Sequence, residues 1–337
     1  MEESRVLVVT DIFDAHADRL ITLLRELGEE PVRLNSSEVP AHTTLIGRMD
    51  KEYWTGNLTL HGSGRVVDLS ALTSIWWRKP NAFGLNDDLG QQEREFAVEE
   101  SEHAVRGLLG ALDCYWVSHP ENIRRAGYKI EQLQRAATLG FDVPRTLVTT
   151  DPDAVRAFFD DCDGQVVYKV LTDPYLAARR YRERGWDAPP PARFVATTPV
   201  TRQTLARLES VRAVPCQFQE YVPKRTELRV TVIGDELFAA ELFSQEHAET
   251  LVDSRQHGVD VRYRAARLPD EVAARCMALV RSYGLNFGAV DLIRTPDDRY
   301  VLLEINPNGQ FLFVQERVPE LRMGEAMAAC LVRGRNG

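Results

Sequence analysis

The sequence predicts a mixed α/β protein in which strands and helices alternate at the start and strands prevail toward the end. The short apolar run Arg5–Thr10 is typical of a buried parallel strand, and apolar residues recur at helical spacing from Ala17 to Leu27. Beyond Cys216, runs rich in β-branched and aromatic residues follow one another between turn residues. We therefore expect an open α/β lobe first and strand-rich structure later in the chain.

Length and composition indicate an ordinary globular protein. The 337 residues allow two or three compact lobes, and 44% of them are hydrophobic. No stretch approaches the roughly 20 apolar residues of a membrane span, and the N-terminus lacks a basic region followed by a long apolar run. We expect a cytoplasmic protein with no membrane partner.

Charge and cysteine content argue against a nucleic-acid-binding protein and against a zinc protein. The net charge of −9 comes without a long basic stripe, so nucleic acid is not an expected partner. A local anion site stays open, because a few Lys, Arg and backbone N–H groups suffice for one. The five cysteines are scattered, without CxxC or Cys/His spacing, which predicts reduced thiols and no zinc site.

The remaining elements follow from apolar periodicity and turn residues. Gly28 ends the first helix, and Trp116–Pro120 closes the first lobe, which also has predicted strands at 30–34 and 75–80 and a helix at 93–112. The middle of the chain predicts a helix at 123–140, a strand at 143–148, a helix at 152–160 and a strand at 165–170. Later strands are expected at 216–222, 227–233, 237–244, 260–263, 288–294 and 300–306, interrupted by a helix at 270–283.

A candidate metal site comes from two of these late strands. Period-two geometry puts Glu304 and Asn306 on one face of their strand, and the turn at 295–299 folds the strand of Asp291 back beside it. Two carboxylates and an amide oxygen suit Mg²⁺ that bridges nucleotide phosphates. An exposed strand face would explain any one of the three, but all of them sit in strongly apolar strands, where an unpartnered carboxylate costs several kcal/mol.

Two lysines raise the question of an anionic ligand. Lys169 stands in the apolar strand 165–170, where its ammonium group must reach solvent at an edge or contact an anion. Lys129 lies on an amphipathic helix. Taken alone, each is explained as well by a solvated lysine.

A link between two strands offers a nucleotide site. The segment 218–230 leaves one strand, crosses Pro223 and enters the next, and such a link exposes backbone groups with which an adenine edge can pair. Glu227 and Arg229 point to the same side of the second strand, where they could accept from ribose hydroxyls and hold a phosphoryl group. A simple cross-strand salt bridge explains them equally well before the rest of the chain is considered.

Taken in order, these motifs resemble the ATP-grasp ligases over most of the chain. Within that superfamily the sequence is most similar to the microviridin-type graspetide macrocyclases, which are relatives of ribosomal-protein glutamate ligases. The segments that carry this finer resemblance are Val6–Thr10, Trp76–Pro80, Phe218–Lys224 and Val252–Arg255. The resemblance implies an N-terminal pre-ATP-grasp α/β domain at 1–118, a central ATP-grasp domain at 119–222 and a C-terminal ATP-grasp domain with the metal site at 223–333. ATP would be held between the central and C-terminal lobes.

The resemblance also implies a role for each candidate residue. ATP phosphates would contact Lys129 and Lys169, adenine would contact Glu220, Tyr221 and Val222, and ribose would contact Glu227. Mg²⁺ would be held by Asp291, Glu304 and Asn306. Arg229 and Arg255 would act at the γ-phosphate and the tetrahedral intermediate, and Arg78 and Asn308 would face the acceptor substrate.

One segment departs from the superfamily pattern. Where a glycine-rich cover often follows the strand lysine, this chain has Thr172–Arg180, which contains no glycine. Arg179, Arg180 or Arg182 would then replace the backbone donors, or the segment would bind peptide. The surrounding stretch 173–198 is rich in Arg and Pro and predicts a mobile loop or hairpin.

The expected function is ATP- and Mg²⁺-dependent ligation through an acylphosphate. The first hypothesis is a macrocyclase that joins Asp or Glu side chains of a ribosomal precursor peptide, with its leader and core, to Thr or Ser hydroxyls or Lys amines. The second is a ligase that adds free amino acids to a protein tail or small acid, and the third is a nucleotide-binding module without catalysis. No histidine falls in the motifs, so no general base is assigned, and a homodimer is left open.

Overall fold

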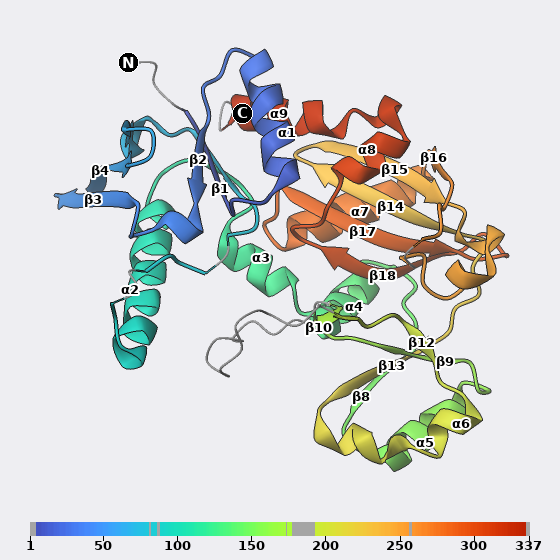
Figure 1. Cartoon of the computed structure of the whole chain (residues 1–337). Helices are drawn as coiled ribbons and strands as arrows, with labels where there is room; N and C mark the ends of the chain where they lie inside the picture. The colour runs from blue at the N-terminus through green and yellow to red at the C-terminus, as the bar shows by residue number, and fades with distance from the viewer. Residues whose placement is uncertain are drawn as a thin grey trace.

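The computed structural model describes residues 5–80, 82–85, 88–172, 174–176, 193–255 and 258–334. The chain opens with a parallel sheet in the order β2–β1–β6–β7, at the blue end of the chain in Figure 1. Its elements are β1 (Val6–Thr10), α1 (Ala15–Glu26), β2 (Val32–Asn35), β6 (Ser74–Trp77), α2 (Gln91–Gly110) and β7 (Tyr115–Val117). The predicted open α/β lobe is confirmed.

Local sequence sets the ends of α1. The Asp14 carboxylate accepts hydrogen bonds from the backbone N–H groups of His16 and Ala17, which caps the first turn. Gly28 follows the helix with φ of +85°, a conformation that glycine adopts without steric cost. The helix therefore begins directly behind the carboxyl end of β1.

A second small sheet in this lobe lies outside the predicted elements. Strands β3 (Thr43–Asp50), β4 (Tyr53–Leu60) and β5 (Arg65–Asp68) form an antiparallel meander. Most of β3 is exposed, so its sequence lacks the apolar alternation that marks a half-buried strand.

The predicted single helix at 123–140 is wrong. The structure has two helices, α3 (Pro120–Ala126) and α4 (Lys129–Thr138), because Tyr128 is extended, with φ of −83° and ψ of 96°. The buried side chain of Gln132 stabilises the break, since its Nε2 donates to the Ala126 carbonyl at 2.5 Å. Lys129 consequently begins a helix instead of lying in the middle of one.

The central part of the chain forms an antiparallel sheet in the order β12–β9–β13–β8, at the lower right of Figure 1. It confirms the strands predicted at 143–148, 165–170 and 216–222 and the helix at 152–160, with shifted ends. The elements are β8 (Thr146–Thr149), α5 (Pro152–Asp161), β9 (Val166–Lys169), β12 (Thr198–Pro199), α6 (Arg202–Leu205) and β13 (Cys216–Glu220). A short hairpin, β10 (Tyr175–Leu176) with β11 (Arg193–Phe194), lies beside them.

The last part is an antiparallel sheet in the order β16–β15–β14–β17–β18, which confirms the strand-rich prediction. Its elements are β14 (Thr226–Ile233), β15 (Glu236–Leu242), β16 (Tyr263–Ala265), α7 (Asp270–Ser282), β17 (Phe287–Arg294), β18 (Tyr300–Asn306), α8 (Leu312–Arg317) and α9 (Met323–Arg333). Helices α8 and α9 were not among the predicted elements. Short 3₁₀ turns lie at Ser36–Glu38, Leu69–Ala71, Leu208–Ala213, Ser244–Glu246, Ala248–Thr250 and Pro319–Leu321.

Alternation along β14 and β17 divides this sheet into an apolar face and a polar face. Val230 and Val290 are fully buried in one hydrophobic cluster with residues of α7 and α4. Arg229 and Asp291, one residue away on each strand, point to the opposite face, because successive side chains of a strand alternate. The helices therefore cover one face and leave the other for a site.

The first and last parts of the chain share a hydrophobic core. Leu20 and Leu24 of α1 pack in one buried cluster with Met327 and Leu331 of α9. Figure 1 shows α1 and α9 side by side, so the C-terminal helix closes the parallel sheet of the first lobe. The domain boundaries given above stay a prediction. Within the described residues no helix combines the length and apolar content needed to cross a membrane.

Candidate active site

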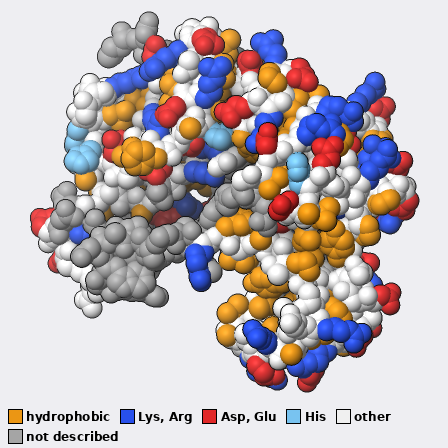
Figure 2. Space-filling view, turned by 45° about the vertical axis from the view of Figure 1, so that its right-hand side comes forward, with side chains coloured by type: hydrophobic (Ala, Val, Ile, Leu, Met, Phe, Trp, Pro, Cys, Tyr) orange, Lys and Arg blue, Asp and Glu red, His pale blue; other side chains and the backbone are white. Residues whose placement is uncertain are grey.

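A cavity of about 1060 Å³ lies between the central sheet and the polar face of the last sheet. Eight Lys and Arg side chains and five acidic side chains line it: Lys79, Arg124, Lys129, Lys169, Lys224, Arg229, Arg255 and Arg317, with Glu220, Glu227, Asp253, Asp291 and Glu304. The lining is thus locally cationic, although the chain carries a net charge of −9. The outer face drawn in Figure 2 instead has basic and acidic side chains interspersed. An anionic ligand suits the cavity.

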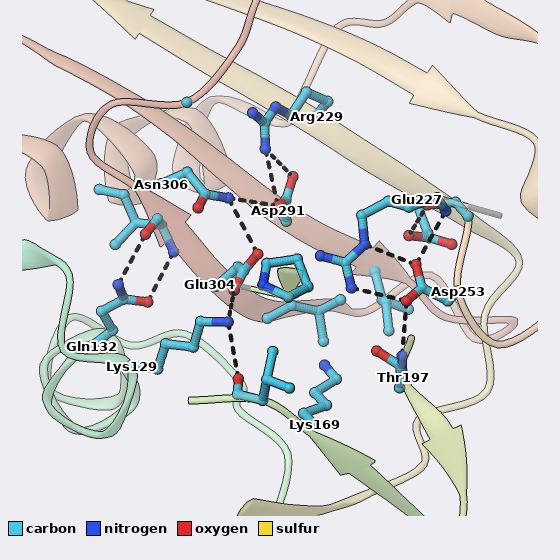
Figure 3. A pocket seen from close by; sticks show the side chains of 18 of the residues that line it. Lys129, Gln132, Lys169, Thr197, Glu227, Arg229, Asp253, Asp291, Glu304 and Asn306 are labelled. Atoms are coloured by element: carbon cyan, nitrogen blue, oxygen red, sulfur yellow. Dashed lines mark hydrogen bonds and ion pairs between the residues drawn. The ribbon is translucent and has the colours of Figure 1, made fainter. Parts of the chain in front are cut away.

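The three candidate metal ligands come together at its centre (Figure 3). Asp291 and Glu304 are cross-strand partners on β17 and β18. The Asn306 Nδ2 donates to Asp291 Oδ2 at 3.3 Å and to Glu304 Oε1 at 3.2 Å. A β-bulge sets this register, because Asp291 pairs with Glu304 while Leu292 pairs with Leu302.

Two cations neutralise the carboxylates. Arg229 Nη1 lies 2.9 Å and 3.0 Å from the two oxygens of Asp291, and Lys129 Nζ lies 3.0 Å from Glu304 Oε2. Burial raises the pKa of Asp291, with Arg229 opposing that shift. Burial also disfavours the ionised form of Glu304, but Lys129 and the other nearby cations together outweigh it and hold the pKa of Glu304 at about 2. The cross-strand salt bridge left open by the sequence exists, between Arg229 and Asp291.

The donor set fits a hard divalent cation. Two carboxylates and an amide are oxygen donors of the kind that Mg²⁺ prefers. Asn306 now presents its amide N–H₂ to both carboxylates, so a cation between them would require the amide to turn over and present Oδ1. No backbone change is needed for that rotation.

Helix α4 fixes the position of this cluster. The Gln132 side chain accepts from the Ile305 N–H at 3.1 Å and donates to the Ile305 carbonyl at 2.9 Å. These bonds hold the backbone between Glu304 and Asn306 against the helix that begins with Lys129. Lys129 Nζ also donates to the carbonyl of Val170, the residue that follows β9.

Lys169 points into the cavity from the end of β9 (Figure 3). Its pKa is lowered to about 8, chiefly by burial; the neighbouring cations Lys129, Lys224 and Arg255 add to this shift, and Glu304 opposes it. An ammonium group in such a position is stabilised by an added anion. Lys169 and Lys129 therefore place two cationic side chains near Glu304.

The link after β13 forms another side of the cavity. Glu220, Tyr221 and Val222 all line it, together with apolar Val167 and Ile293. The N–H groups of Glu220 and Tyr221 donate to the carbonyls of Arg145 and Gln165, which ties the link to the central sheet. Glu220 Oε2 lies 3.2 Å from Arg145 Nε, so the Glu220 side chain forms a salt bridge within the protein.

Glu227 is held by three donors. Lys224 Nζ and Ser244 Oγ each lie 2.7 Å from Oε1, and Ser254 Oγ lies 3.1 Å from Oε2. The Lys224 side chain is 4% exposed and also donates to the Val252 carbonyl at 2.9 Å. Sequence analysis missed Lys224, although its place in the link, three residues before Glu227, was a usable signal.

Arg255 is oriented by Asp253, which sequence analysis also missed. Arg255 Nε lies 2.8 Å from Asp253 Oδ1, and Nη2 lies 2.9 Å from Oδ2. Asp253 Oδ2 also accepts from the Thr197 N–H at 2.9 Å. Burial opposes ionisation of Asp253, but Arg255 outweighs it and holds the pKa of Asp253 well below its usual range. The loop after β15 is thus fixed to the segment before β12.

Arg78, which was predicted to face the acceptor substrate, does not line the cavity in this structure. Its side chain is 1% exposed, and its Nη1 donates to the Asn308 carbonyl at 2.7 Å. Asn308 lines the cavity, but its side chain binds Arg78 and the Trp77 carbonyl. The predicted roles of Arg179, Arg180 and Arg182 fall outside the described residues.

The chain is similar to known proteins over nearly its whole length. Residues 5–124 match the family model of the MvdD pre-ATP grasp domain. The macrocyclase MdnC from Microcystis aeruginosa MRC, solved with precursor peptide MdnA, is 29% identical with a TM-score of 0.82, over 97% of this chain and 99% of MdnC. A RiPP-associated ATP-grasp ligase from Chryseobacterium gregarium, solved with ADP and a leader and core peptide, is 27% identical with a TM-score of 0.86, over 98% and 96% of the two chains.

A more distant structure shares the fold. The ATP-grasp ligase PsnB, solved with a variant precursor, Mg and ADP, is 21% identical with a TM-score of 0.74, over 98% of this chain and 99% of PsnB. No curated protein sequence matches the chain. The fold is thus the ATP-grasp fold, and the protein is an ATP-grasp ligase. Its full-length likeness to MdnC assigns it to the graspetide macrocyclase type within that class.

Proposed function

We propose that the protein uses ATP and Mg²⁺ to activate Asp or Glu side chains of a ribosomally made precursor peptide and joins them within that peptide to Thr or Ser hydroxyls, or to Lys amines. The observation that supports this most directly is the convergence of two lysines, two arginines and the Asp291–Glu304–Asn306 cluster on one cavity. The relatives solved with precursor, leader or core peptides add further support.

In this proposal the nucleotide lies between the two sheets. Lys129 and Lys169 bind its phosphates, and the backbone of residues 220–222 pairs with the adenine edge. Glu227 accepts from the ribose hydroxyls. It retains room for such a donor, because a carboxylate offers about four acceptor positions and Lys224, Ser244 and Ser254 occupy three.

Asp291, Glu304 and Asn306 would hold Mg²⁺, which supplies positive charge at the phosphates when it is bound. Arg229 and Lys129 now neutralise the two carboxylates. If the carboxylates served as metal ligands, Arg229 and Lys129 would become available to bind the phosphates. Arg229 and Lys129 would thus neutralise the carboxylates when the metal is absent and the nucleotide phosphates when it is bound.

The chemistry follows from the weakness of a carboxylate as an acyl donor. A carboxylate oxygen attacks the γ-phosphorus and ADP leaves, which converts the oxygen into part of a phosphate leaving group. A hydroxyl or amine then adds to the carbonyl carbon, phosphate leaves, and the proton of the nucleophile is lost. Arg229 would neutralise charge during the first step, and Arg255 would stabilise the oxyanion of the second.

Mass spectrometry of the peptide product tests the reaction. Incubation of the protein with its precursor peptide, ATP and Mg²⁺ should lower the peptide mass by about 18 Da for each bond, because each intramolecular acyl transfer removes one water. A gain in mass would instead indicate addition of a free amino acid. An unchanged mass with ATP binding intact would support a nucleotide-binding module.

Variants of the carboxylate cluster test the site. Asp291→Asn and Glu304→Gln keep the side-chain volume and remove one anionic ligand each, so we expect turnover to fall by at least about a hundredfold. Asp297→Asn is the matched control, since Asp297 is an exposed carboxylate on the β17–β18 turn. Full turnover in either cluster variant contradicts the metal assignment.

A further inference from the structure

The loop that follows the candidate metal ligands is held from three sides. This loop, residues 307–311, begins directly after Asn306 and lines the cavity at Asn308, Gly309 and Gln310. Arg229 Nη2 donates to the Gln310 carbonyl at 2.9 Å, so the arginine that pairs with Asp291 also holds the loop. A methyl group on Gly309 would meet Arg229 Nη2 at 2.7 Å and Ala289 Cβ at 3.0 Å. The loop therefore packs directly on the catalytic face of the sheet.

The second support comes from the first lobe. Arg78 stands just after β6, and its Nη1 donates to the Asn308 carbonyl at 2.7 Å, to Asn308 Oδ1 at 3.2 Å and to the Gly309 carbonyl at 3.3 Å. Asn308 Nδ2 lies 3.4 Å from the Trp77 carbonyl. One guanidinium thus reaches two successive carbonyls of the loop from a residue some 230 positions earlier in the chain.

Arg78 is charged and almost completely buried, which requires a dedicated partner. Asp14 supplies it, with Oδ2 at 3.5 Å from Arg78 Nε, and Asp14 is itself 8% exposed. Thr10 donates to the same Asp14 oxygen at 2.7 Å. Removing either partner would leave an uncompensated buried charge, which is strongly destabilising. Apolar packing alone would not require the buried ion pair of Arg78 and Asp14 at this position.

The third support is His16 on α1. Its Nε2 accepts from the N–H groups of Phe311 and Leu312, each at 3.3 Å, and its ring packs edge-on against Phe311 at 5.5 Å. The first lobe therefore holds both ends of the loop, Asn308 through Arg78 and Phe311 through His16. Neither of these side chains lines the cavity.

We propose that Arg78, held by Asp14, is a positioning residue of the active site, which fixes the 307–311 loop from the first lobe and so sets Asn306 and Arg229 for Mg²⁺ and phosphate. The inference rests on the nucleotide and metal roles given above. It explains why the first lobe carries a buried arginine at the end of one of its inner strands. It also assigns the Trp76–Pro80 segment to loop positioning.

Arg78→Lys is the test variant, because lysine keeps a positive charge beside Asp14 but lacks the planar fork that reaches both carbonyls. The dissociation constant of ADP is measured by calorimetry, with Mg²⁺ and with EDTA, alongside the melting temperature. We expect binding of ADP with Mg²⁺ to weaken by roughly tenfold to a hundredfold, as for other residues that orient metal ligands. Binding with EDTA should change less than about twofold, because Lys129 and Lys169 are untouched.

Arg65→Lys is the matched control. Arg65 also belongs to the first lobe, and its guanidinium likewise reaches two successive carbonyls, with Nη2 donating to Glu30 at 2.7 Å and Nη1 to Pro31 at 3.1 Å, but these residues do not line the cavity. It should change stability without a selective loss of Mg²⁺-dependent binding. If Arg78→Lys does not fold, the double variant Arg78→Met with Asp14→Asn removes both charges together and keeps an N-cap for α1.

The outcomes separate the two proposals. The positioning role is overturned if a folded Arg78 variant loses ADP affinity equally with Mg²⁺ and with EDTA. It is also overturned if the variant loses no affinity under either condition. Failure of the unaltered protein to bind ADP under any condition would instead overturn the proposed function. A selective loss in Arg78→Lys together with no selective loss in Arg65→Lys supports the positioning role.

Discussion

The charge of Lys169 depends on pH just above neutrality. Its pKa is lowered to about 8, chiefly by burial, from the 10.5 of an exposed lysine. Below pH 8 the ammonium form prevails and attracts phosphate, whereas above pH 8 the neutral amine prevails. Because only the charged form attracts phosphate, nucleotide affinity must fall as pH rises through this pKa.

We therefore predict that nucleotide affinity declines by up to about tenfold per pH unit above pH 8, and that binding at pH 8 takes up about half a proton. Calorimetry in buffers of different ionisation enthalpy measures both quantities. Lys169→Met should bind weakly and lose this pH dependence, while Lys51→Met, on the exposed β3–β4 turn, should behave as the unaltered protein. An unaltered pH slope in Lys169→Met would remove Lys169 from the phosphate site.

Single residues also show where sequence reasoning succeeds and where it stops. The spacing of Glu304 and Asn306 correctly predicted that both side chains lie on one face of their strand, near Asp291. The burial of Arg78 was not foreseeable in this way, because its partner Asp14 lies on another strand–helix connection and sequence spacing does not show that contact. Asp253 was missed for the same reason, since its role depends on Thr197 from the central part of the chain.

Among the elements, strands were predicted better than the breaks within them. Leu302 faces the apolar cluster, and strict alternation would turn Glu304 to that same side. The bulge at this point turns Glu304 to the cavity instead, opposite Asp291. A bulge depends on how two strands pair, so one strand's sequence does not reveal it. The break before Lys129 likewise depends on Gln132, which bonds both Ala126 and Ile305.

Arg255 lies in the loop after β15, and its predicted role at the tetrahedral intermediate depends on how this loop orients it. Asp253 is buried and holds Arg255 with both carboxylate oxygens, so we predict that Asp253→Asn lowers the rate of peptide modification by roughly tenfold to a hundredfold. Nucleotide affinity should change little, because Lys129 and Lys169 keep their places. Single-turnover kinetics followed by mass spectrometry measures the rate, and calorimetry measures the affinity.

Asp260→Asn is the control for that loop. Asp260 pairs with Arg317 at the surface with its side chain 90% exposed, and such pairs contribute little. A rate in Asp253→Asn equal to that of Asp260→Asn would show that Arg255 needs no orienting carboxylate. A parallel loss of nucleotide affinity would show that Asp253 serves the whole cavity.

At the scale of the molecule, the N-terminal and C-terminal parts of the chain pack against each other. Helix α9 packs against α1, and His16 of α1 accepts from the backbone at the start of α8. That contact needs a neutral imidazole, because Nε2 must accept. Burial, together with the charge of Arg78, lowers the pKa of His16 from 6.5 to about 4.

This contact predicts a defined loss of stability in acid. Between pH 6.5 and 4 the unfolded chain binds a proton at His16 and the folded chain does not, so the free energy of unfolding rises with pH across this window. The pKa shift of His16 corresponds to about 3 kcal/mol of folding stability, which is fully present above pH 6.5 and is lost as pH falls toward 4. His16→Gln keeps an acceptor and does not titrate, so its urea unfolding curves should lack this part of the pH dependence. His103→Gln, an exposed histidine on α2, should retain it. Equal pH dependence in the His16 variant and the unaltered protein would show that the junction of the lobes does not depend on a neutral His16.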